Sequence, residues 1–427
     1  MTDNIPTYDT AEVLRNQKKY GEAAEQFAFL WKQKPIAMFG QRYAFCLRKL
    51  NKTDEAEAVL KDVLEKFPDD KYAKSELGWV LYDKELKPAK EESDLGKTLH
   101  FANEIVKLNP DLFAVRLVAM AVMKVAKGKK KWDVTLEWSN KLNPTDLSSE
   151  ARMFDGKRGM SERETWYVGR AKALLELGQF DEARTFAQQG LVEFPDELFL
   201  ARTAALALAR NGKLDEGADE LRKLLSHRRA DWYVKADLAD VELSRGNLAD
   251  AFRIMSDAVS NSQDDEYKLG CFVTLGKIAI GMGKLEIAAE HVALAKAVRA
   301  ANNWSISPDL SLLEQNVVKA FKDSNKALPS LPSDVKELSK ICHQRWREGA
   351  SDGLNFVKGT LKPFDPNKSF AFIKPDDGKE DIFVLLRDIP RNCAKEGARL
   401  EFILEKSFDQ KKNRESTQAT KVRCINK

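Results

Sequence analysis

Three phenylalanines near the C-terminus are spaced so that they can share one face of a β-hairpin. Phe370 and Phe372 lie two residues apart in a strand-like run, and Phe383 follows in a second such run after a short polar turn. Alternate residues of a strand point to the same face, and residues opposite each other across a hairpin are neighbours. Exposed rings in this arrangement can stack unpaired nucleic-acid bases, at about 1–3 kcal/mol per base and with little sequence preference.

The alternative interpretation is that these rings form the core of a small β-domain, because large apolar side chains are usually buried. The residues between them do not decide the matter, since Ala371, Ile373, Ile382 and Val384 would make an equally apolar face. The spacing therefore predicts a hairpin with three rings on one face and leaves open which face meets water.

Positive charge is concentrated in the same part of the chain. Residues 351–427 contain 16 Lys and Arg against 12 Asp and Glu, whereas the other 350 residues contain 54 of each kind. The whole net charge of +4 therefore belongs to this segment. A local basic excess is one mark of a phosphate-facing surface, although +4 taken alone is better explained as an ordinary solvated surface.

The elements that position these residues are short strands. After Leu354 the apolar period changes from 3.6 to 2, and turns separate the runs that follow. Five such runs within 80 residues predict a small closed barrel. The runs span residues 356–364, 369–375, 380–386, 399–406 and 418–425.

Residues 357–427 resemble the bacterial cold-shock domain, a five-stranded barrel of the OB type. Lys368–Ile373 (KSFAFI) is similar to that family's first RNA-binding motif, K-G-F-G-F-I, and Asp381–Leu385 (DIFVL) to its second, D-V-F-V-H. Further matches are the run Gly359–Phe364, the turn at 375–378 and Glu396-Gly397. The resemblance implies that the phenylalanines face solvent, that the small and aliphatic residues fill the barrel, and that the domain binds single-stranded RNA or DNA.

We expect basic side chains near the rings to contact phosphates, with lysines at the border of the rings and Lys411, Lys412 and Arg414 in the long loop between the last two strands. Lys358 would stand at the edge of this surface. The full set of expected nucleic-acid-binding residues is Lys362, Phe364, Lys368, Phe370, Phe372, Lys374, Phe383, Lys411, Lys412 and Arg414. Nothing in it distinguishes RNA from DNA, because a stacking surface contacts base faces rather than the 2′-hydroxyl.

Departures from the family pattern weaken this expected surface. Pro363 stands where the family has a stacking Trp, and Leu385 stands where it has His. Ser369 and Ala371 replace glycines and crowd the backbone slightly. We therefore expect weak binding, and the alternative is a barrel that contacts proteins instead of nucleic acid.

The rest of the chain is repetitive. The hexapeptides GQFDEA (178–183), GKLDEG (212–217) and GNLADA (246–251) recur every 34 residues, and each lies between two stretches of helical apolar periodicity. GKLEIA (283–288) follows after 37 residues, and KKYGEA (18–23) and NKTDEA (51–56) are 33 apart. Gly or Asn suits the turn that closes one helix, and the small sixth residue allows the next helix to pack closely. Prolines that can end second helices follow five units, at positions 35, 68, 110, 144 and 195.

This pattern resembles the tetratricopeptide repeat, a helix–turn–helix unit of 34 residues. Leu77-Gly78 and Leu275-Gly276 carry the resemblance in first helices, as do the small sixth residues in second helices. About eight units fit between residue 7 and roughly residue 300. The third has about eight extra residues, Trp132 replaces the small residue of the fourth, and a 17-residue insertion (145–161) follows. Stacked repeats share one core and curve around a concave groove.

In that family, side chains of the first helices line the groove and bind an extended peptide. The resemblance implies an aromatic entrance followed by a basic channel, suited to a peptide with acidic residues. The implied peptide-groove residues are Phe45, Arg48, Trp79, Tyr82, Lys124, Lys172, Arg202 and Lys277. The family's Lys/Asn clamp for a terminal carboxylate is not reproduced, which argues against chaperone tails as ligands; those positions hold Gln41, Phe45, Ser75 and Trp79. Each residue taken alone can also be an ordinary packed or solvated side chain.

Signs of catalysis are missing from the sequence. The four histidines (100, 227, 291 and 343) are isolated and match no metal-ligand spacing, and no nucleotide-binding loop or hydrolase motif occurs. GMGKLE (281–286) is the turn of the eighth repeat rather than a phosphate loop. We therefore expect no enzyme activity, no metal or cofactor, and no small-molecule substrate.

The N-terminus lacks the basic and apolar regions of a secretory signal, and no apolar run is long enough for a membrane span. The five cysteines (46, 271, 342, 393 and 424) are far apart in sequence, odd in number and without a CxxC pair, which predicts free thiols in a reducing cytosol.

The sequence thus predicts a multi-domain, mainly α-helical protein. Residues 1–323 form an α-α superhelical solenoid of about eight repeats and a capping helix, residues 324–351 a linker and spacer helix, and residues 352–427 an OB-type five-stranded barrel. The function that we expect is a cytoplasmic, bacterial, non-enzymatic adaptor that holds a protein partner in the groove and single-stranded RNA or DNA on the barrel. The alternatives are a pure protein scaffold, or a regulatory subunit whose barrel no longer binds nucleic acid.

Overall fold

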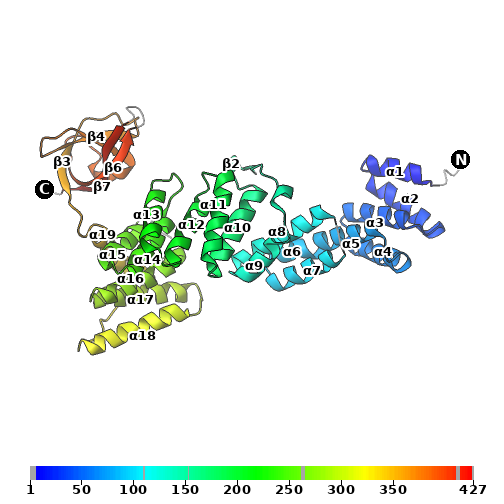
Figure 1. The fold of residues 1–427 in the computed structure, drawn as a ribbon, viewed down its shortest axis with the longest axis horizontal. Coiled ribbons are helices and arrows are strands. Elements are labelled where there is room, and N and C mark those ends of the chain that lie inside the picture. The colour runs from blue at the N-terminus through cyan, green and yellow to red at the C-terminus, as the bar shows by residue number, and fades with distance from the viewer. Residues whose placement is uncertain (1–5, 109–110, 152, 261–264, 410–413, 426–427) are drawn as a thin grey trace. The chain divides into compact units, whose positions relative to one another are not determined.

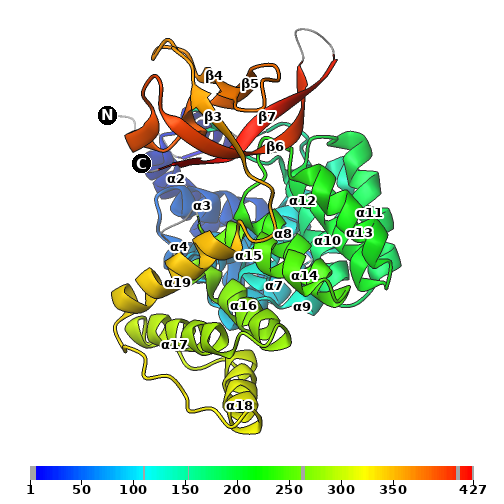
Figure 2. The same cartoon turned by 90° about the vertical axis from the view of Figure 1, so that its left-hand side faces the viewer.

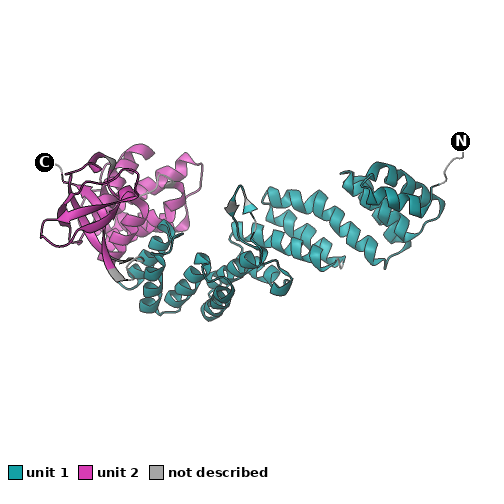
Figure 3. Ribbon diagram, turned by 90° about the horizontal axis from the view of Figure 1, so that it is seen from above, with its two compact units in different colours: residues 1–247 teal, residues 248–427 magenta. Residues whose placement is uncertain are grey.

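The computed structural model describes residues 6–425 except 109–110, 152, 261–264 and 410–413. Residues 1–247 (unit 1) and 248–427 (unit 2) form two compact units, which are coloured separately in Figure 3. Among the described residues, no helix is both long enough and apolar enough to cross a membrane.

Unit 1 is a succession of helices, most of which pack against the helices next to them in sequence (Figure 1). Several begin at a residue suited to the N-cap position: Asp70, Asp111 and Ser161 each accept a hydrogen bond from the backbone N–H three residues later. The helices are α1 (Tyr8–Asn16), α2 (Tyr20–Gln33), α3 (Ala37–Lys49), α4 (Thr53–Lys66), α5 (Lys71–Leu81), α6 (Lys87–Glu91), α7 (Leu95–Lys107), α8 (Leu112–Gly128), α9 (Trp132–Ser139), α10 (Glu162–Glu176), α11 (Phe180–Glu193), α12 (Leu198–Arg210), α13 (Leu214–Leu224) and α14 (Trp232–Ser244).

The recurring hexapeptide forms the turn between the two helices of a repeat. Gly178 and Gly212 follow α10 and α12 with φ of +79° and +85°, a left-handed conformation that glycine adopts without strain and that ends a helix. At the sixth position Ala183 is fully buried. At the same position of the next repeat, a Cβ on Gly217 would come within 2.7 Å of the Cβ of Ala209. The small residue is therefore required by close helix packing, as the repeat pattern predicts.

The extra residues of the third repeat lengthen a helix instead of forming a loop. Helix α5 continues directly into a π-helix, η1 (Tyr82–Leu86), and then into α6. Leu86 is fully buried and packs in a cluster that includes Ile105 and Trp138. The 17-residue insertion begins within a 3₁₀ turn, η2 (Pro144–Asp146), and contains a small hairpin of β1 (Met153–Phe154) and β2 (Lys157–Arg158).

Unit 2 begins with helices of the same kind. They are α15 (Leu248–Ser260), the 3₁₀ turn η3 (Asp265–Lys268), α16 (Leu269–Gly281), α17 (Leu285–Ala301), α18 (Pro308–Asp323) and α19 (Val335–Gly349). Helix α19 packs on both α15 and α17. Trp346 of α19 is fully buried and stacks on Phe272, with ring centroids 5.3 Å apart. This helix is therefore an integral part of the helical stack of unit 2.

From the end of α19 the chain passes into a closed five-stranded barrel (Figure 2). The strands are β3 (Val357–Leu361), β4 (Phe370–Pro375), β5 (Ile382–Leu385), β6 (Arg399–Asp409) and β7 (Arg414–Cys424), with the 3₁₀ turns η4 (Leu386–Asp388) and η5 (Arg391–Cys393) after β5. Around the barrel the order is β3-β4-β5-β7-β6; β5 and β7 are parallel and the other pairs antiparallel. The predicted fold class, a helical repeat array followed by a five-stranded barrel, is confirmed.

Burial alternates along β4 and decides which face of the hairpin meets water. Ala371 and Ile373 are buried in the barrel core together with Val384, Leu400 and Phe402. The small and aliphatic residues therefore fill the barrel, and the intervening positions of β4 point outward.

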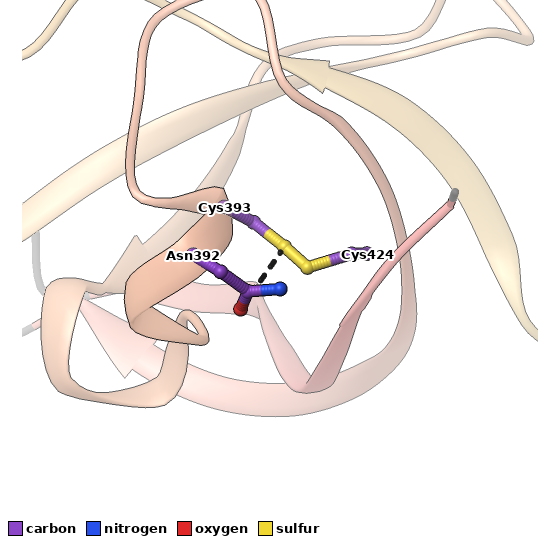
Figure 4. Close-up of a disulfide and its surroundings, with 3 residues drawn as sticks. All are labelled: Asn392, Cys393 and Cys424. Carbon is purple, nitrogen blue, oxygen red and sulfur yellow. Dashed lines mark hydrogen bonds between the residues drawn. A yellow bond between two sulfur atoms is a disulfide. The ribbon is translucent and has the colours of Figure 1, made fainter. Parts of the chain in front are cut away.

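A disulfide joins Cys393 in η5 to Cys424 at the end of β7 (Figure 4). Asn392 Oδ1 lies 3.7 Å from Cys393 Sγ. The prediction of free thiols is wrong for this pair, because closure of the barrel brings two Cα atoms that are 31 residues apart in sequence to 5.9 Å from each other. Cys46, Cys271 and Cys342 are free and buried.

Candidate functional site

Phe370, Phe372 and Phe383, hereafter the phenylalanine cluster, meet on the outer face of the barrel. The centroids of Phe370 and Phe383 are 5.5 Å apart with nearly parallel rings, and Phe372 stands edge-on to both, at 5.9 and 6.1 Å. The register explains this contact, since Phe372 is the direct partner of Phe383 across the β4–β5 pair. Phe372 is 41% exposed, and the other two rings are half-buried. The cluster thus forms a solvent-exposed apolar surface of three rings.

Phe364 is not brought into this cluster. It is half-buried and packs against the barrel core. Leu385 is the partner of Phe370 across the β4–β5 pair and lies on the same outer face, while Pro363 is exposed before Phe364. The surface therefore has three rings rather than four, with an aliphatic side chain beside the first.

The predicted basic border is only partly available to a ligand. The ammonium of Lys362 lies 2.6 Å from the Asp381 carboxylate, so its charge is balanced within the barrel. Lys374 follows Phe372 on the same face of β4 and is exposed, as are Lys358 and Lys368.

The structure does not describe the side chains of the three cations that the sequence assigns to the loop between the last two strands. Lys411 and Lys412 lie outside the described residues. Arg414 begins β7, and its side chain also lies outside what the structure describes.

One polar residue beside the phenylalanine cluster was not predicted from the sequence. Gln418 of β7 is the direct partner of Phe383 in the parallel β5–β7 pair, and it is half-buried. Its neighbour Ala419 is buried in the core, which puts Gln418 on the outer face. An amide at this place can both donate and accept hydrogen bonds at a base edge. The alternation of polar and apolar residues around Ala419 indicates that Gln418 faces outward. The parallel pairing of β5 with β7, which places Gln418 opposite Phe383, is not predictable from the sequence.

A second ion pair lies on the outer face near Lys374. Arg399 of β6 reaches Asp376 with two hydrogen bonds, of 2.6 and 2.5 Å, and donates a third to Thr360 at 2.9 Å. The Arg399 guanidinium holds the pKa of Asp376 below its usual range. Arg399 therefore ties β6 to the end of β4 and does not offer a free charge.

In unit 1 the predicted aromatic entrance is assembled around one arginine. The Arg48 guanidinium lies 5.6 Å from the ring centroid of Phe45 and 5.7 Å from that of Trp79. Its charge is balanced by Glu76 at 2.7 Å and Asp83 at 3.0 Å. Phe45, Arg48 and Trp79 thus form a packed, internally neutralised set.

The predicted basic channel is largely neutralised in the same way. Arg202 forms a bidentate pair with Asp237, and Lys172 pairs with Glu176 at 2.7 Å. Tyr82 and Lys124 remain as lining residues of one pocket in unit 1. Lys277 is exposed on α16 of unit 2, whereas the other seven predicted groove residues belong to unit 1.

One of the four histidines is a buried residue of the helical core. His291 is fully buried in α17, and burial lowers its pKa to about 4. Within the described part of the chain, no group of three or more His, Cys, Asp and Glu side chains is placed to hold a metal ion.

Comparison with known proteins gives matches to both parts of the chain. The family described as tetratricopeptide repeat matches residues 41–70 and 202–266. The cold shock-like protein CspE of Escherichia coli (strain K12) is 45% identical over 52 residues, which are 12% of this chain and 75% of that protein. The cold shock-like protein CspB of Yersinia pestis is 43% identical over 54 residues, 12% of this chain and 77% of that protein.

Among solved structures, a tetratricopeptide repeat protein from Parabacteroides merdae aligns with 73% of this chain and 96% of its own. The TM-score of that alignment is 0.38 and the sequence identity 12%.

Proposed function

This chain is a tetratricopeptide-repeat protein whose C-terminal domain belongs to the cold-shock-like family, and we propose that it is a non-enzymatic adaptor. Its repeats would hold a protein partner. Its barrel would bind single-stranded RNA or DNA through the phenylalanine cluster. The mechanism is recruitment, in which a polypeptide is brought to an exposed strand whose bases are stacked on the rings.

The observation that carries this proposal is the phenylalanine cluster on the solvent side of the barrel. Three large apolar rings at a surface cost free energy unless something covers them, and bases are flat, apolar partners of matching size. Lys368 and Lys374 border the rings and supply charge for the phosphate backbone. Gln418 adds a hydrogen-bonding group beside Phe383.

The barrel alone would bind weakly. Pro363 and Leu385 supply no aromatic ring for stacking, and Lys362 is paired with Asp381. Attachment to the repeats would offset this weakness when the partner itself is near the nucleic acid, because tethering raises the effective concentration of the second site. We therefore expect the complete adaptor with its partner to bind a strand more tightly than the barrel does by itself.

The second candidate is a protein scaffold or regulatory subunit whose barrel has no nucleic-acid role. The Lys362–Asp381 pair and the mutual stacking of Phe370 and Phe383 favour it, since both use up groups that a nucleic acid would contact.

A titration of the full chain with a fluorescent 12-nucleotide oligo-U or oligo-dT, at several salt concentrations, separates these candidates. The adaptor hypothesis predicts that log K falls linearly with log salt and that Phe370→Ala with Phe383→Ala weakens binding at least tenfold. Leu404→Ala is the matched control, because Leu404 is an apolar β6 residue that is 40% exposed. No binding at low salt, or binding indifferent to the double substitution, would favour the scaffold.

The cytoplasm is the compartment that we assign to the adaptor, and the cysteines provide its test. Three of them are free and buried, whereas Cys393 and Cys424 form a bond that is rare in a reducing cytosol. Alkylation of cells before lysis, followed by mass spectrometry, would measure the oxidised fraction of this pair. A largely reduced pair fits the cytoplasm, and a fully oxidised pair contradicts it.

A further inference from the structure

A pocket of about 560 Å³ in unit 1 lies between segments of three repeats. Its walls come from the extended helix of the third repeat (η1 and α6), from α8 and from α10. Tyr82 and Lys90 belong to the first wall, Lys124 and Lys127 to the second, and Thr165 to the third. Two residues that the sequence assigns to the groove, Tyr82 and Lys124, thus line the same cavity.

Irregularities of the repeats build this pocket. The π-turn supplies Tyr82, and the extra residues that follow it supply Lys90. Single π-turns inside helices are frequent at functional sites. On the α10 wall, a Cβ at Gly169 would come within 3.2 Å of Met123 Cε, so the lack of a side chain there keeps the space open. The pocket is therefore a feature of this chain rather than of a regular repeat.

Two lysines of α8 give the pocket a positive side. Lys124 and Lys127 are exposed, and within the described residues neither forms an ion pair. The one carboxylate of the lining, Glu162, is already approached by Arg116 at 3.5 Å. The side chain of Lys127 is exposed along part of its length, but its ammonium is partly desolvated. This desolvation and the nearby Lys172 lower the pKa of Lys127, so an anion bound beside it would favour its charged form.

The remaining lining is apolar and adaptable. Leu117 and Met120 are half-buried on the same helix as the lysines, and Met123 is buried behind them. Methionine side chains fill irregular gaps and accommodate ligands of different shape. A ligand that matches this pocket carries a negative group next to a large apolar group.

We propose that this pocket binds an acidic segment of a protein partner. A Glu or Asp carboxylate of the segment contacts Lys124 and Lys127, and a large apolar side chain next to it packs on Leu117 and Met120. The inference rests on the proposed protein-binding role of the repeats, and it adds where the partner is gripped and by what chemistry.

A nucleic acid fits the same surface less well. A phosphate backbone needs a row of available cations, and the other predicted groove cations of unit 1, Arg48, Lys172 and Arg202, are paired with carboxylates. The aromatic residues near Arg48 are also packed against one another: Trp79 contacts both Tyr82 and Phe113, with centroids 5.9 and 5.6 Å apart. Charge that is confined to one apolar pocket favours a side-chain carboxylate.

The test uses a random 12-residue peptide library displayed on phage and selected on the immobilised full chain. We expect selected peptides to combine acidic residues with a Leu, Met or aromatic residue. A fluorescent synthetic copy should bind at least tenfold more weakly to Lys124→Glu with Lys127→Glu. The matched control reverses two exposed lysines outside the pocket, Lys107→Glu with Lys213→Glu, and should leave binding unchanged. Circular dichroism checks that both variants remain folded.

Each other outcome overturns the inference in a distinguishable way. If the selected peptides lack acidic residues, or if binding does not change in the Lys124 and Lys127 reversals, the pocket is not the binding site for an acidic segment. The proposed protein-binding role of the repeats is unaffected by either result. No selected peptide at all contradicts both. An oligo-U that still binds after Phe370→Ala with Phe383→Ala, and is lost on the lysine reversals, would make the pocket a phosphate site instead.

Discussion

Trp346 of α19 donates its indole Nε1–H to Nε2 of His291 in α17, over 2.8 Å, and both side chains are fully buried. The other ring nitrogen, Nδ1, lies 2.7 Å from the carbonyl oxygen of Ile287. Nε2 must accept and Nδ1 must donate, so the imidazole is neutral and its tautomer is fixed. A polar contact with no access to water thus joins the last helix before the barrel to the helical stack.

Trp346→Phe should destabilise unit 2 by about 2–4 kcal/mol. The change removes the donor, leaves Nε2 of His291 buried without its partner, and opens a cavity beside Phe272. Native-state hydrogen exchange of the α17 and α19 amides measures the loss locally, which suits a chain of more than one unit. Trp304→Phe is the control, since Trp304 is 44% exposed and its replacement should cost less than about 0.5 kcal/mol. Equal effects of the two changes would contradict the assigned role of the hydrogen bond.

The stability of unit 2 should fall as the pH drops from about 6.5 to 4. His291 takes up a proton near pH 6.5 when unfolded, but burial lowers its pKa to about 4 in the folded chain. The unfolded state therefore binds more protons in this window, and the free energy of unfolding decreases by about 3 kcal/mol as the pH falls across it. Above pH 6.5 the contribution of His291 to the free energy of unfolding is fully present. The charged neighbours are the Arg345–Glu290 pair, at 3.0 Å, and His343 packs against Trp346.

His291→Gln isolates this effect, because an amide oxygen can still accept from Trp346 and does not titrate. Its hydrogen-exchange stability, corrected for intrinsic exchange rates, should lose the slope between pH 6.5 and 4 that the wild type shows. His100→Gln, at an exposed position of α7, should keep it. An unchanged slope in His291→Gln would assign the pH dependence to other groups.

Asp381→Asn should strengthen oligonucleotide binding by the full chain. The substitution removes the carboxylate that holds Lys362 at 2.6 Å and frees one cation next to the phenylalanine cluster. We expect a two- to fivefold gain at low salt and a slope of log K against log salt that is steeper by about 0.7, the value for one more phosphate contact on a single strand. Asp62→Asn breaks the similarly exposed Lys66–Asp62 pair of α4 and should change neither quantity. A gain in affinity without a steeper slope would mean that Lys362 makes no phosphate contact.

Leu385→His should also raise the affinity of the barrel, by about fivefold. Leu385 is opposite Phe370 on the outer face, where an imidazole could stack on a base and donate a hydrogen bond. The same change at Leu404 of β6, which is 40% exposed, serves as control. If oligonucleotide titration finds no gain at position 385, then its aliphatic side chain is not what limits binding.

Local pattern was enough to predict most of the fold. Gly178 and Gly212 mark left-handed turns, and the alternation of small or aliphatic residues with Phe and Lys in β4 marks a strand of the barrel wall. Both features depend only on residues that are close together in the sequence. Partners that are distant in sequence were not predictable. Arg48 and Arg202 meet carboxylates 28 and 35 residues away, and only helix stacking decides that these charges are neutralised.

In the candidate site, too, contacts within one hairpin were predictable and contacts between distant segments were not. Phe370, Phe372 and Phe383 were grouped correctly because one hairpin holds them all. Gln418 reaches Phe383 only through a parallel pair between strands that are not consecutive in the chain. The pocket of unit 1 depends on a π-turn, whose single extra residue per turn leaves no clear periodic signal in the sequence.

The bond between Cys393 and Cys424 makes a closed covalent ring of main chain that contains β6 and β7. A protease that cuts once inside this ring would leave two polypeptides joined as one molecule, and they would separate on a gel only after addition of a reductant. A cut in the linker 324–334 would instead give a separate fragment, made of α19 and the barrel, on a denaturing gel with or without reductant. The position of a nick can therefore be assigned from paired reduced and unreduced lanes, and the ring keeps both halves of the barrel together after it is nicked.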